Sequence, residues 1–475
     1  MNFLDSLRET TNYTITENGA LTHKSSLDPV VDFFALAGAM RDRPGAAADL
    51  FQKAYSEDPL TALRTLFYIR DVRGGQGERK VFRSCFHRLW QIDVERAQSL
   101  VHHIPEYGRW DDVFAVPVNE IGAVAHVIWD QLQADLDSER PSLLAKWLPS
   151  ENASSKQTKL SALALRRNLG YSSRAYRKVL SKLRARIRLL EQDMSTNNWT
   201  EIDYSKLPSQ AHRKHVKAFK RHTPERYQAY LDSVTRGEAK INVSTVFPYE
   251  IFEMITGTGY AASDKIAYAN VAWEALPDYT GGEDALVLAD VSASMNGRPM
   301  SVSVSLALYF AERNKGLFKG YFMTFSEEPE LVKISGNNLR ERFMSIARSR
   351  WGYNTNLSKA LRAILDAAVK ADSPPPKVFY IISDMEFDQA APGNKRTIFQ
   401  QARKEFAAKG FELPHIVFWN VDARQDQAPA LAHDNCVSLV SGCSPTIFAQ
   451  AVQGKTPREL VDQVVHSERY ERITL

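Results

Sequence analysis

Two carboxylates and three hydroxyls in the last part of the chain carry oxygen atoms that suit a divalent cation. Asp290, Ser292 and Ser294 alternate at the end of an apolar run, and alternate residues of an extended segment point to the same side. Thr355 precedes an expected helix, and Asp384 follows a second apolar run. Such hard oxygen ligands suit Mg²⁺, Mn²⁺ or Ca²⁺ rather than zinc. The five residues therefore predict a metal site.

The elements around these residues predict a doubly wound α/β domain over residues 281–475. Apolar strands alternate there with amphipathic helices, a pattern typical of a mostly parallel sheet covered on both faces. The expected strands are residues 285–291, 320–325, 377–383, 415–421 and 436–440, and the expected helices are near 300–314, 339–348, 358–370, 397–409 and 444–453. Ligands of such sheets bind beyond the carboxyl ends of the strands, where the five oxygen-bearing residues fall.

The charge of this predicted site indicates binding rather than catalysis. Two carboxylates and three neutral hydroxyls leave a dication incompletely neutralised, so an acidic group from another molecule would be attracted to it. A metal-assisted hydrolysis is chemically possible. No nearby His or Cys is arranged as a base or nucleophile, however, so we do not expect an enzyme.

These five positions resemble the metal-ion-dependent adhesion site of von Willebrand factor A domains, which reads D-x-S-x-S, then Thr, then Asp. The resemblance implies a Rossmann-like fold, direct metal binding by Ser292, Ser294 and Thr355, a looser role for the two aspartates, and a protein partner whose carboxylate completes the coordination. Met385 departs from the family, where glycine is common after the last aspartate. Glu386 and Asp388 either modulate the metal affinity or are solvated loop residues, and we favour the second interpretation.

Residues 1–280 predict an all-α domain of stacked helix pairs, as in a HEAT-like solenoid or ring. Apolar residues recur at spacings of three and four in 28–40, 59–69, 78–90 and 171–190, the period of an amphipathic helix. Short polar or Gly/Pro breaks separate these segments. Many helices with short links favour a helical-repeat architecture.

One segment of this helical part is strongly cationic, although the whole chain has a net charge of only +4. Residues 156–222 contain 17 basic and 4 acidic side chains, which indicates an anionic partner. Lys and Arg neutralise phosphates, and Phe219 and Tyr227 lie close by in sequence to stack on unpaired bases. The candidate RNA-binding residues are Arg174, Arg177, Lys178, Lys182, Arg184, Arg186, Arg188, Arg213, Lys214, Lys217, Lys220 and Arg221. The alternative is a solvated charged surface balanced by the acidic remainder of the domain.

Nearly the whole chain resembles the Ro ribonucleoprotein (TROVE) architecture, a ring of helical repeats joined by an A-type domain. The resemblance is closer to a group of bacterial, viral and plant proteins with this layout. Its motifs are RDVRGGQGER (70–79), PEYGRWDDVF (105–114), NNWTEIDYSKLPSQAHRKHVKAF (197–219) and RGEAKINVSTVFPYEI (236–251). It implies an RNA-binding scaffold, since Ro rings bind small structured RNAs and the 3′ ends of misfolded RNAs.

Two other features favour structural interpretations. The glycine-rich segment 74–80 lacks a preceding strand and a G-K-[ST] ending, so a structural turn is favoured over a phosphate-binding loop. Trp110, Trp129 and Trp147 are expected to be core anchors rather than platforms for bases.

The remaining expectations concern location and partners. The start of the sequence does not resemble a secretory signal, the three cysteines form no C-x-x-C pair, and no apolar stretch is long enough to span a membrane. We therefore expect a cytoplasmic monomer with reduced thiols and no membrane association. The alternative to the RNA-binding scaffold is a metal-dependent protein-interaction module that binds no nucleic acid.

Overall fold

The computed structural model describes residues 3–187, 189–256, 265–281, 284–324, 328–347, 355–389, 396–450 and 454–475. The chain forms two compact units. Unit 1 contains Met1–Thr65 and Val246–Glu471, and unit 2 contains Leu66–Thr245 with Arg472–Leu475. The division that the sequence predicts at residue 280 does not coincide with these units, because both flanks of the helical part pack with the sheet.

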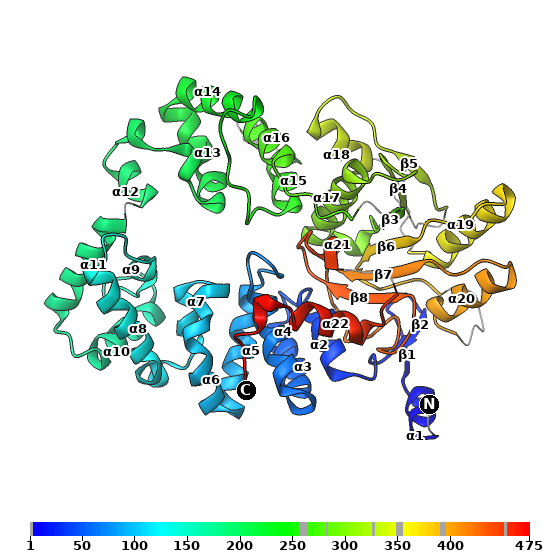
Figure 1. Cartoon of the computed structure of the whole chain (residues 1–475), viewed down its shortest axis with the longest axis horizontal. Helices are drawn as coiled ribbons and strands as arrows, with labels where there is room; N and C mark the ends of the chain where they lie inside the picture. The colour runs from blue at the N-terminus through cyan, green and yellow to red at the C-terminus, as the bar shows by residue number, and fades with distance from the viewer. Residues whose placement is uncertain are drawn as a thin grey trace. The chain divides into compact units, whose positions relative to one another are not determined.

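A six-stranded sheet forms the centre of unit 1 (Figure 1). Its strands are β3 (Ala285–Ala289), β4 (Tyr321–Thr324), β5 (Leu331–Lys333), β6 (Val378–Ser383), β7 (His415–Asn420) and β8 (Val437–Ser441), in the order β5-β4-β3-β6-β7-β8. All neighbouring pairs are parallel except β4 and β5. The chain therefore reverses its direction of winding between β3 and β6, which is the switch point where ligands of doubly wound sheets bind.

Helices cover both faces of this sheet, and β3, β6, β7 and β8 are therefore buried along their whole length. Figure 1 shows α17 and α21 on one side of the strands and α19 and α20 on the other. The helices of this part are α15 (Pro248–Thr256), α16 (Ile266–Glu274), α17 (Arg298–Arg313), α18 (Leu339–Ala347), α19 (Leu357–Ala371), α20 (Ile398–Ala408), α21 (Ile447–Gln450) and α22 (Pro457–Val465).

The N-terminal segment is also part of unit 1. It contains α1 (Phe3–Thr11), the hairpin of β1 (Tyr13–Ile15) and β2 (Leu21–His23), α2 (Pro29–Ala37), α3 (Pro44–Glu57) and most of α4 (Pro59–Arg70). Helix α2 is almost entirely buried and packs against β8 and α22. The hairpin and α2 therefore belong to the same unit as the sheet, although they come before the helical unit in the sequence.

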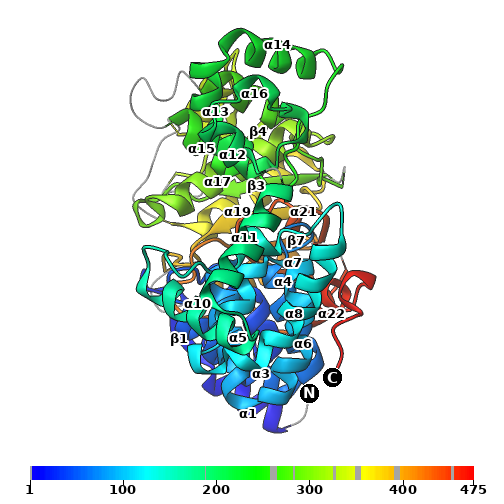
Figure 2. The same ribbon diagram turned by 90° about the vertical axis from the view of Figure 1, so that its left-hand side faces the viewer.

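Unit 2 consists of helices joined by short turns. They are α5 (Arg79–Ile92), α6 (Val94–Leu100), α7 (Ile104–Tyr107), α8 (Ile121–Asp137), α9 (Leu144–Trp147), α10 (Lys156–Asn168), α11 (Ser173–Ile187), α12 (Leu190–Ser195), α13 (Ser209–His222) and α14 (Pro224–Thr235). Helices close in sequence pack against one another, as α5 and α6, α8 and α10, and α13 and α14 do. Figure 2 shows the helices of this unit facing the viewer. None of the helices in the described residues is long and apolar enough to cross a bilayer.

The glycine-rich turn after α4 has a structural role. The amides of Gln76, Gly77 and Glu78 donate to carbonyls in the last turns of α4 or just after it, at 3.1, 3.0 and 2.8 Å. A Cβ on Gly75 would lie 2.0 Å from the carbonyl oxygen of Tyr68, so only glycine fits there. These amide groups cap a helix and are not available to a phosphate.

The structure confirms the coarse prediction of a mostly helical N-terminal part followed by an α/β domain, whose sheet has six strands. Two details differ from the all-α prediction for residues 1–280 and from the five predicted strands. The hairpin β1–β2 falls in the segment predicted to be helical, and the short antiparallel edge strand β5 was not predicted. Both strands of the hairpin, like β5, have only three residues, too few for a periodic pattern to show.

Candidate functional site

The two predicted carboxylates lie together at the switch point of the sheet. Asp290 follows β3 and Asp384 follows β6, and the amide of Asp290 donates a 3.0 Å hydrogen bond to Ile382 at the end of β6. Both side chains are buried, with 3 % and 1 % of their surface exposed. Burial, and next the charge of Asp384, raise the pKa of Asp290. The charge of Asp384 disfavours the ionisation of Asp290, and a cation between the two carboxylates would remove that cost.

The two predicted serines stand on the turn that begins directly after β3. The amide of Ser292 donates to Oδ1 of Asp290 at 2.9 Å, which fixes the start of the turn. The hydroxyls of Ser292 and Ser294 lie 2.9 Å apart. The two hydroxyls therefore lie together near Asp290, but on a turn and a 3-10 helix (Ala293–Met295) rather than on the extended segment that the sequence predicts.

Thr355 is the most distant of the five in sequence, and it too lies at this edge. Its side chain is buried, with 1 % exposed, and its carbonyl oxygen accepts a 3.0 Å hydrogen bond from the amide of Asp388. Because Asp388 belongs to the loop that starts at Asp384, the loops before α19 and after β6 meet.

The chemistry of the donor set fits a divalent cation. Among the residues that the structure describes, Oδ2 of Asp384 is buried and has no hydrogen-bond partner, although a buried charged oxygen normally requires one. No three His, Cys, Asp or Glu side chains of the described ranges form a metal-holding group. A metal site here would therefore depend on the hydroxyls as well as on the two carboxylates, as Mg²⁺ sites with few carboxylates do.

Arg424 is a residue of this site that the sequence analysis missed. It lies on the loop after β7, with Nε 3.8 Å from Oδ2 of Asp384 and 3.6 Å from Oδ2 of Asp422. Its guanidinium also donates to the carbonyl of Ser294. The loop has no recognisable motif, so no signal in the sequence connects this arginine with residues 130 positions earlier.

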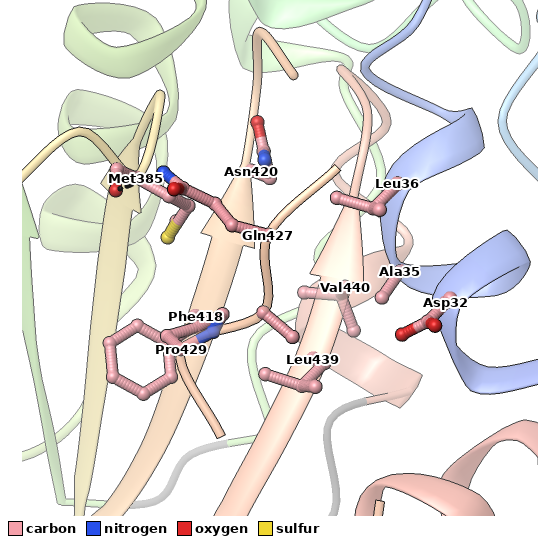
Figure 3. Close-up of a pocket in the computed structure, with 11 residues that line it drawn as sticks. Asp32, Ala35, Leu36, Met385, Phe418, Asn420, Gln427, Pro429, Leu439 and Val440 are labelled. Carbon is pink, nitrogen blue, oxygen red and sulfur yellow. Dashed lines mark hydrogen bonds between the residues drawn. The ribbon is translucent and has the colours of Figure 1, made fainter. Parts of the chain in front are cut away.

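Met385 stands where the sequence resemblance led us to expect glycine, and the structure shows how a methionine fits there. Its φ is +66°, a left-handed conformation that favours glycine. The side chain is 4 % exposed and lines a small hollow between α2, β7 and β8. Figure 3 shows Met385 facing this hollow from one side and Leu36 and Asp32 from the other. Burial of the methionine offsets the backbone strain.

Glu386 is not a solvated loop residue, so our favoured interpretation of it was wrong. It is 1 % exposed and accepts hydrogen bonds from the amide of Glu17 at 2.7 Å and from Gln427 at 3.0 Å. The hydroxyl of Thr16 donates to the carbonyl of Phe387 at 2.6 Å. The N-terminal hairpin thus holds the loop after Asp384, a contact between segments about 370 residues apart.

The structure separates the predicted RNA-binding residues into two groups, and Arg184 and Arg186 belong to a structural one. Arg184 donates to the carbonyls of Ala145 and Leu148 at 2.8 and 2.9 Å. Arg186 donates to the carbonyl of Leu136 at 3.0 Å and to that of Ser138. Both arginines satisfy carbonyl groups at helix C-termini, so their guanidinium groups are engaged within the protein. Arg188 lies outside the described residues.

The second group points to solvent. Exposed candidates are Arg174, Arg177, Lys178 and Lys182 on α11 and Lys214, Lys217 and Arg221 on α13, with Arg213 and Lys220 half-buried. Within the described residues, Arg174, Lys178, Lys182, Lys217 and Arg221 make no hydrogen bond or ion pair with another side chain. These cations are therefore available to an external anion.

The aromatic side chains near these cations differ from the prediction. Phe219 and Tyr227 are fully buried and cannot stack on a base. Trp129, which we expected in the core, is 40 % exposed, and its ring centroid lies 5.9 Å from that of Tyr171. Tyr171 lies just before α11, separated from it by Ser172, so this aromatic pair is close to the start of the basic helix.

Two family models match the chain, one over the α/β domain and one over most of the helical part. Residues 284–472 match a domain of unknown function, DUF7788, and residues 16–93 and 143–278 match a second domain of unknown function, DUF2828. The second match includes β2 and α2, which belong to unit 1, but begins after β1.

Two individual proteins are similar over most of the chain. Uncharacterized protein L728 of Acanthamoeba polyphaga mimivirus is 29 % identical over 488 residues, covering 92 % of this chain and 84 % of that protein. The crystal structure of the Deinococcus radiodurans RO (RSR) protein matches with a TM-score of 0.41 and 13 % identity, over 90 % of this chain and 99 % of that one.

Proposed function

We propose that this protein is an RNA-binding scaffold whose helical part binds RNA and whose α/β domain binds a protein partner through a divalent metal. The observation that carries the RNA-binding proposal is the set of exposed cations on α11 and on α13 that have no side-chain partner among the described residues. Such a surface costs free energy through mutual repulsion and gains it when a polyanion binds.

RNA suits this surface better than a small anion does. Each phosphate contact releases condensed counterions, so several separate cations add up to tight, salt-dependent binding. The exposed Trp129 and its neighbour Tyr171 supply aromatic surface on which an unpaired base can stack. We therefore favour small RNAs with single-stranded segments as ligands.

Filter binding of a single-stranded RNA at several salt concentrations tests this proposal. The triple variant R174E/K178E/K182E should weaken binding at least tenfold at about 100 mM salt, because phosphate contacts are lost. Each lost contact should also reduce the dependence of binding on salt. A matched control is K370E/K404E/K409E, which makes the same charge change at exposed positions of α19 and after or within α20. Equal loss in both variants, or none in either, would reject α11 as the RNA-binding surface.

The α/β domain is proposed to be of the von Willebrand A type and to hold Mg²⁺, Mn²⁺ or Ca²⁺. Asp290, Ser292, Ser294, Thr355 and Asp384 would hold the ion, which would supply a positive charge that attracts an acidic side chain of a partner. The support is the buried Oδ2 of Asp384, which lacks a hydrogen-bond donor, together with the convergence of the hydroxyls of Ser292 and Ser294.

Direct metal titration tests this part separately from RNA binding. Binding of Mn²⁺ is followed by the loss of the free-ion electron paramagnetic resonance signal and should saturate at one ion per chain. The D384N variant should bind Mn²⁺ at least tenfold more weakly. A control at Asp388, a half-buried carboxylate of the same loop, should keep the affinity in D388N. Equal binding by the wild type and D384N would reject the site.

The second candidate function is a metal-dependent protein-interaction module without nucleic acid. It is favoured by one specific observation, namely that Arg184 and Arg186 serve helix ends and leave fewer cations for RNA. It predicts that a partner is captured in a metal-dependent way while single-stranded RNA is not retained at any salt concentration.

The proposal further describes a cytoplasmic, monomeric protein that binds ligands and does not catalyse a reaction. Cys85, Cys436 and Cys443 form no disulfide within the described residues, which fits a reducing compartment. Because we propose no catalysis, RNA incubated with the protein and Mg²⁺ should remain intact. We also propose that the helical part is HEAT-like.

A further inference from the structure

Arg424 contacts several groups around the candidate metal site. Besides Asp384 and Asp422, its guanidinium lies 3.7 Å from Oε2 of Glu17 on the N-terminal hairpin. About one third of its side chain is exposed, at 34 %. Three carboxylates on three separate segments therefore surround one arginine.

The contact with Asp384 is a charge interaction without a hydrogen bond. The 3.8 Å separation exceeds hydrogen-bond length, and Oδ2 of Asp384 keeps its lone pairs free. A buried carboxylate needs a balancing charge, and Arg424 supplies one without occupying the oxygen. The oxygen can then receive a second cation once the arginine moves away.

Acceptors for the displaced guanidinium are already in place. Asp422 lies two residues away on the same loop, and Glu17 is fixed because its own amide donates to Glu386 at 2.7 Å. Neither carboxylate belongs to the five candidate metal ligands. A small rotation of the arginine side chain would keep it paired while removing it from Asp384.

We propose that Arg424 is the built-in counter-cation of this site, which balances Asp384 when no dication is bound and pairs with Glu17 and Asp422 when one is. The inference rests on the proposed metal site. It makes Arg424 the residue that sets metal affinity, because every dication that binds must overcome the repulsion of the guanidinium or displace it. It also makes Glu17 a positioning residue that favours the metal-bound arrangement.

Mn²⁺ titration of the full chain, read by electron paramagnetic resonance, tests this assignment. R424Q should bind Mn²⁺ about tenfold more tightly, since it removes a positive charge close to the ion. R424K, which keeps the charge, should stay within about threefold of the wild type. E17Q should bind about threefold more weakly, because the displaced guanidinium loses an acceptor.

R43Q is the matched control for loosening of the loop. Arg43 donates to the carbonyl of Ala423 at 3.1 Å and to Asp426 at 3.0 Å, so it holds the same loop without contacting Asp384. Its loss should leave the Mn²⁺ affinity unchanged, and circular dichroism of all variants checks that they fold.

The outcomes distinguish failure of the proposed role of Arg424 from failure of the proposed metal site. Unchanged or weaker Mn²⁺ binding by R424Q, with a normal wild-type titration, overturns the role of Arg424 and leaves the metal site standing. An equal gain in R43Q also overturns it, since loop mobility would then be the cause. If neither the wild type nor R424Q binds Mn²⁺, the proposed metal site fails and this inference fails with it.

Discussion

The hydroxyl of Ser383 donates a 2.7 Å hydrogen bond to Oδ2 of Asp290, which joins the carboxyl ends of β6 and β3. Ser383 is fully buried and also accepts a hydrogen bond from the amide of Met385 at 3.1 Å. One hydroxyl therefore orients the carboxylate before the turn and the backbone after Asp384.

We expect S383A to lower the free energy of unfolding by about 1–3 kcal/mol, because a buried carboxylate oxygen loses its donor. Urea unfolding followed by circular dichroism measures this change. S303A is the matched control: Ser303 is also fully buried, but its hydroxyl has no hydrogen-bond partner in the described residues. Equal destabilisation by both variants would mean that the bond to Asp290 contributes nothing specific.

Arg186 and Lys182 lie one helical turn apart on α11 and should behave in opposite ways. R186A leaves the carbonyls at the end of α8 without a donor, so it should destabilise the protein by about 1–3 kcal/mol. K182A, an exposed lysine, should change stability by less than about 0.5 kcal/mol and weaken RNA binding by a small factor. Thermal unfolding and filter binding of both variants check the prediction, and a stable R186A would contradict the capping role.

Trp129 should contribute to RNA binding through stacking rather than charge. Loss of one stacked base costs about 1–3 kcal/mol, so W129A should weaken binding of a single-stranded oligonucleotide by roughly tenfold or more and leave binding of inorganic polyphosphate unchanged. L160A on the neighbouring helix α10 is the control, since Leu160 is similarly exposed, at 44 %. If polyphosphate binding fell in parallel, stacking would not be the cause.

Buried His212 should make stability depend on pH. Burial lowers its pKa to about 4 from 6.5, and the ring lies 2.9 Å from the hydroxyl of Tyr227. The unfolded chain binds the proton first as the pH falls below 6.5, so stability is present above that value and is lost towards pH 4. Between pH 7 and pH 5 the loss is about 2 kcal/mol.

Urea unfolding at pH 7 and pH 5 measures this loss, and H212Q should reduce it. H126Q, at an exposed histidine of α8, should show the same pH dependence as the wild type. A pH dependence that H212Q leaves unchanged would assign the loss to other groups, of which buried His23 and His415 also have a pKa lowered to about 4.

Local patterns were sufficient for the elements that carry long periodic signals. All five predicted strands exist with bounds shifted by at most two residues, because a strand buried on both faces must be apolar throughout. Ser292 and Ser294 lie near Asp290 because they are close in sequence, although the segment turns into a 3-10 helix and is not extended as predicted. The predictions failed for three-residue strands and for side chains whose burial depends on distant segments, such as Glu386 and Trp129.

The basic segment shows why composition could not separate function from structure. The sequence contains 17 basic residues between positions 156 and 222, and charge alone makes them equivalent. Only packing reveals that Arg184 and Arg186 reach helix ends while Lys178 and Lys182 reach solvent. A guanidinium can serve either role, and its neighbours in space decide which.

The sequence by itself determined the alternation of strands and helices, the alignment of oxygen-bearing side chains after β3, and the excess of positive charge in the helical part, because each depends on residues near one another in the chain. Tertiary structure alone placed Arg424 beside Asp384 and the hairpin at 13–23 against the loop after β6. These contacts join segments from about 40 to 370 residues apart, and only the folded sheet brings such segments to one edge.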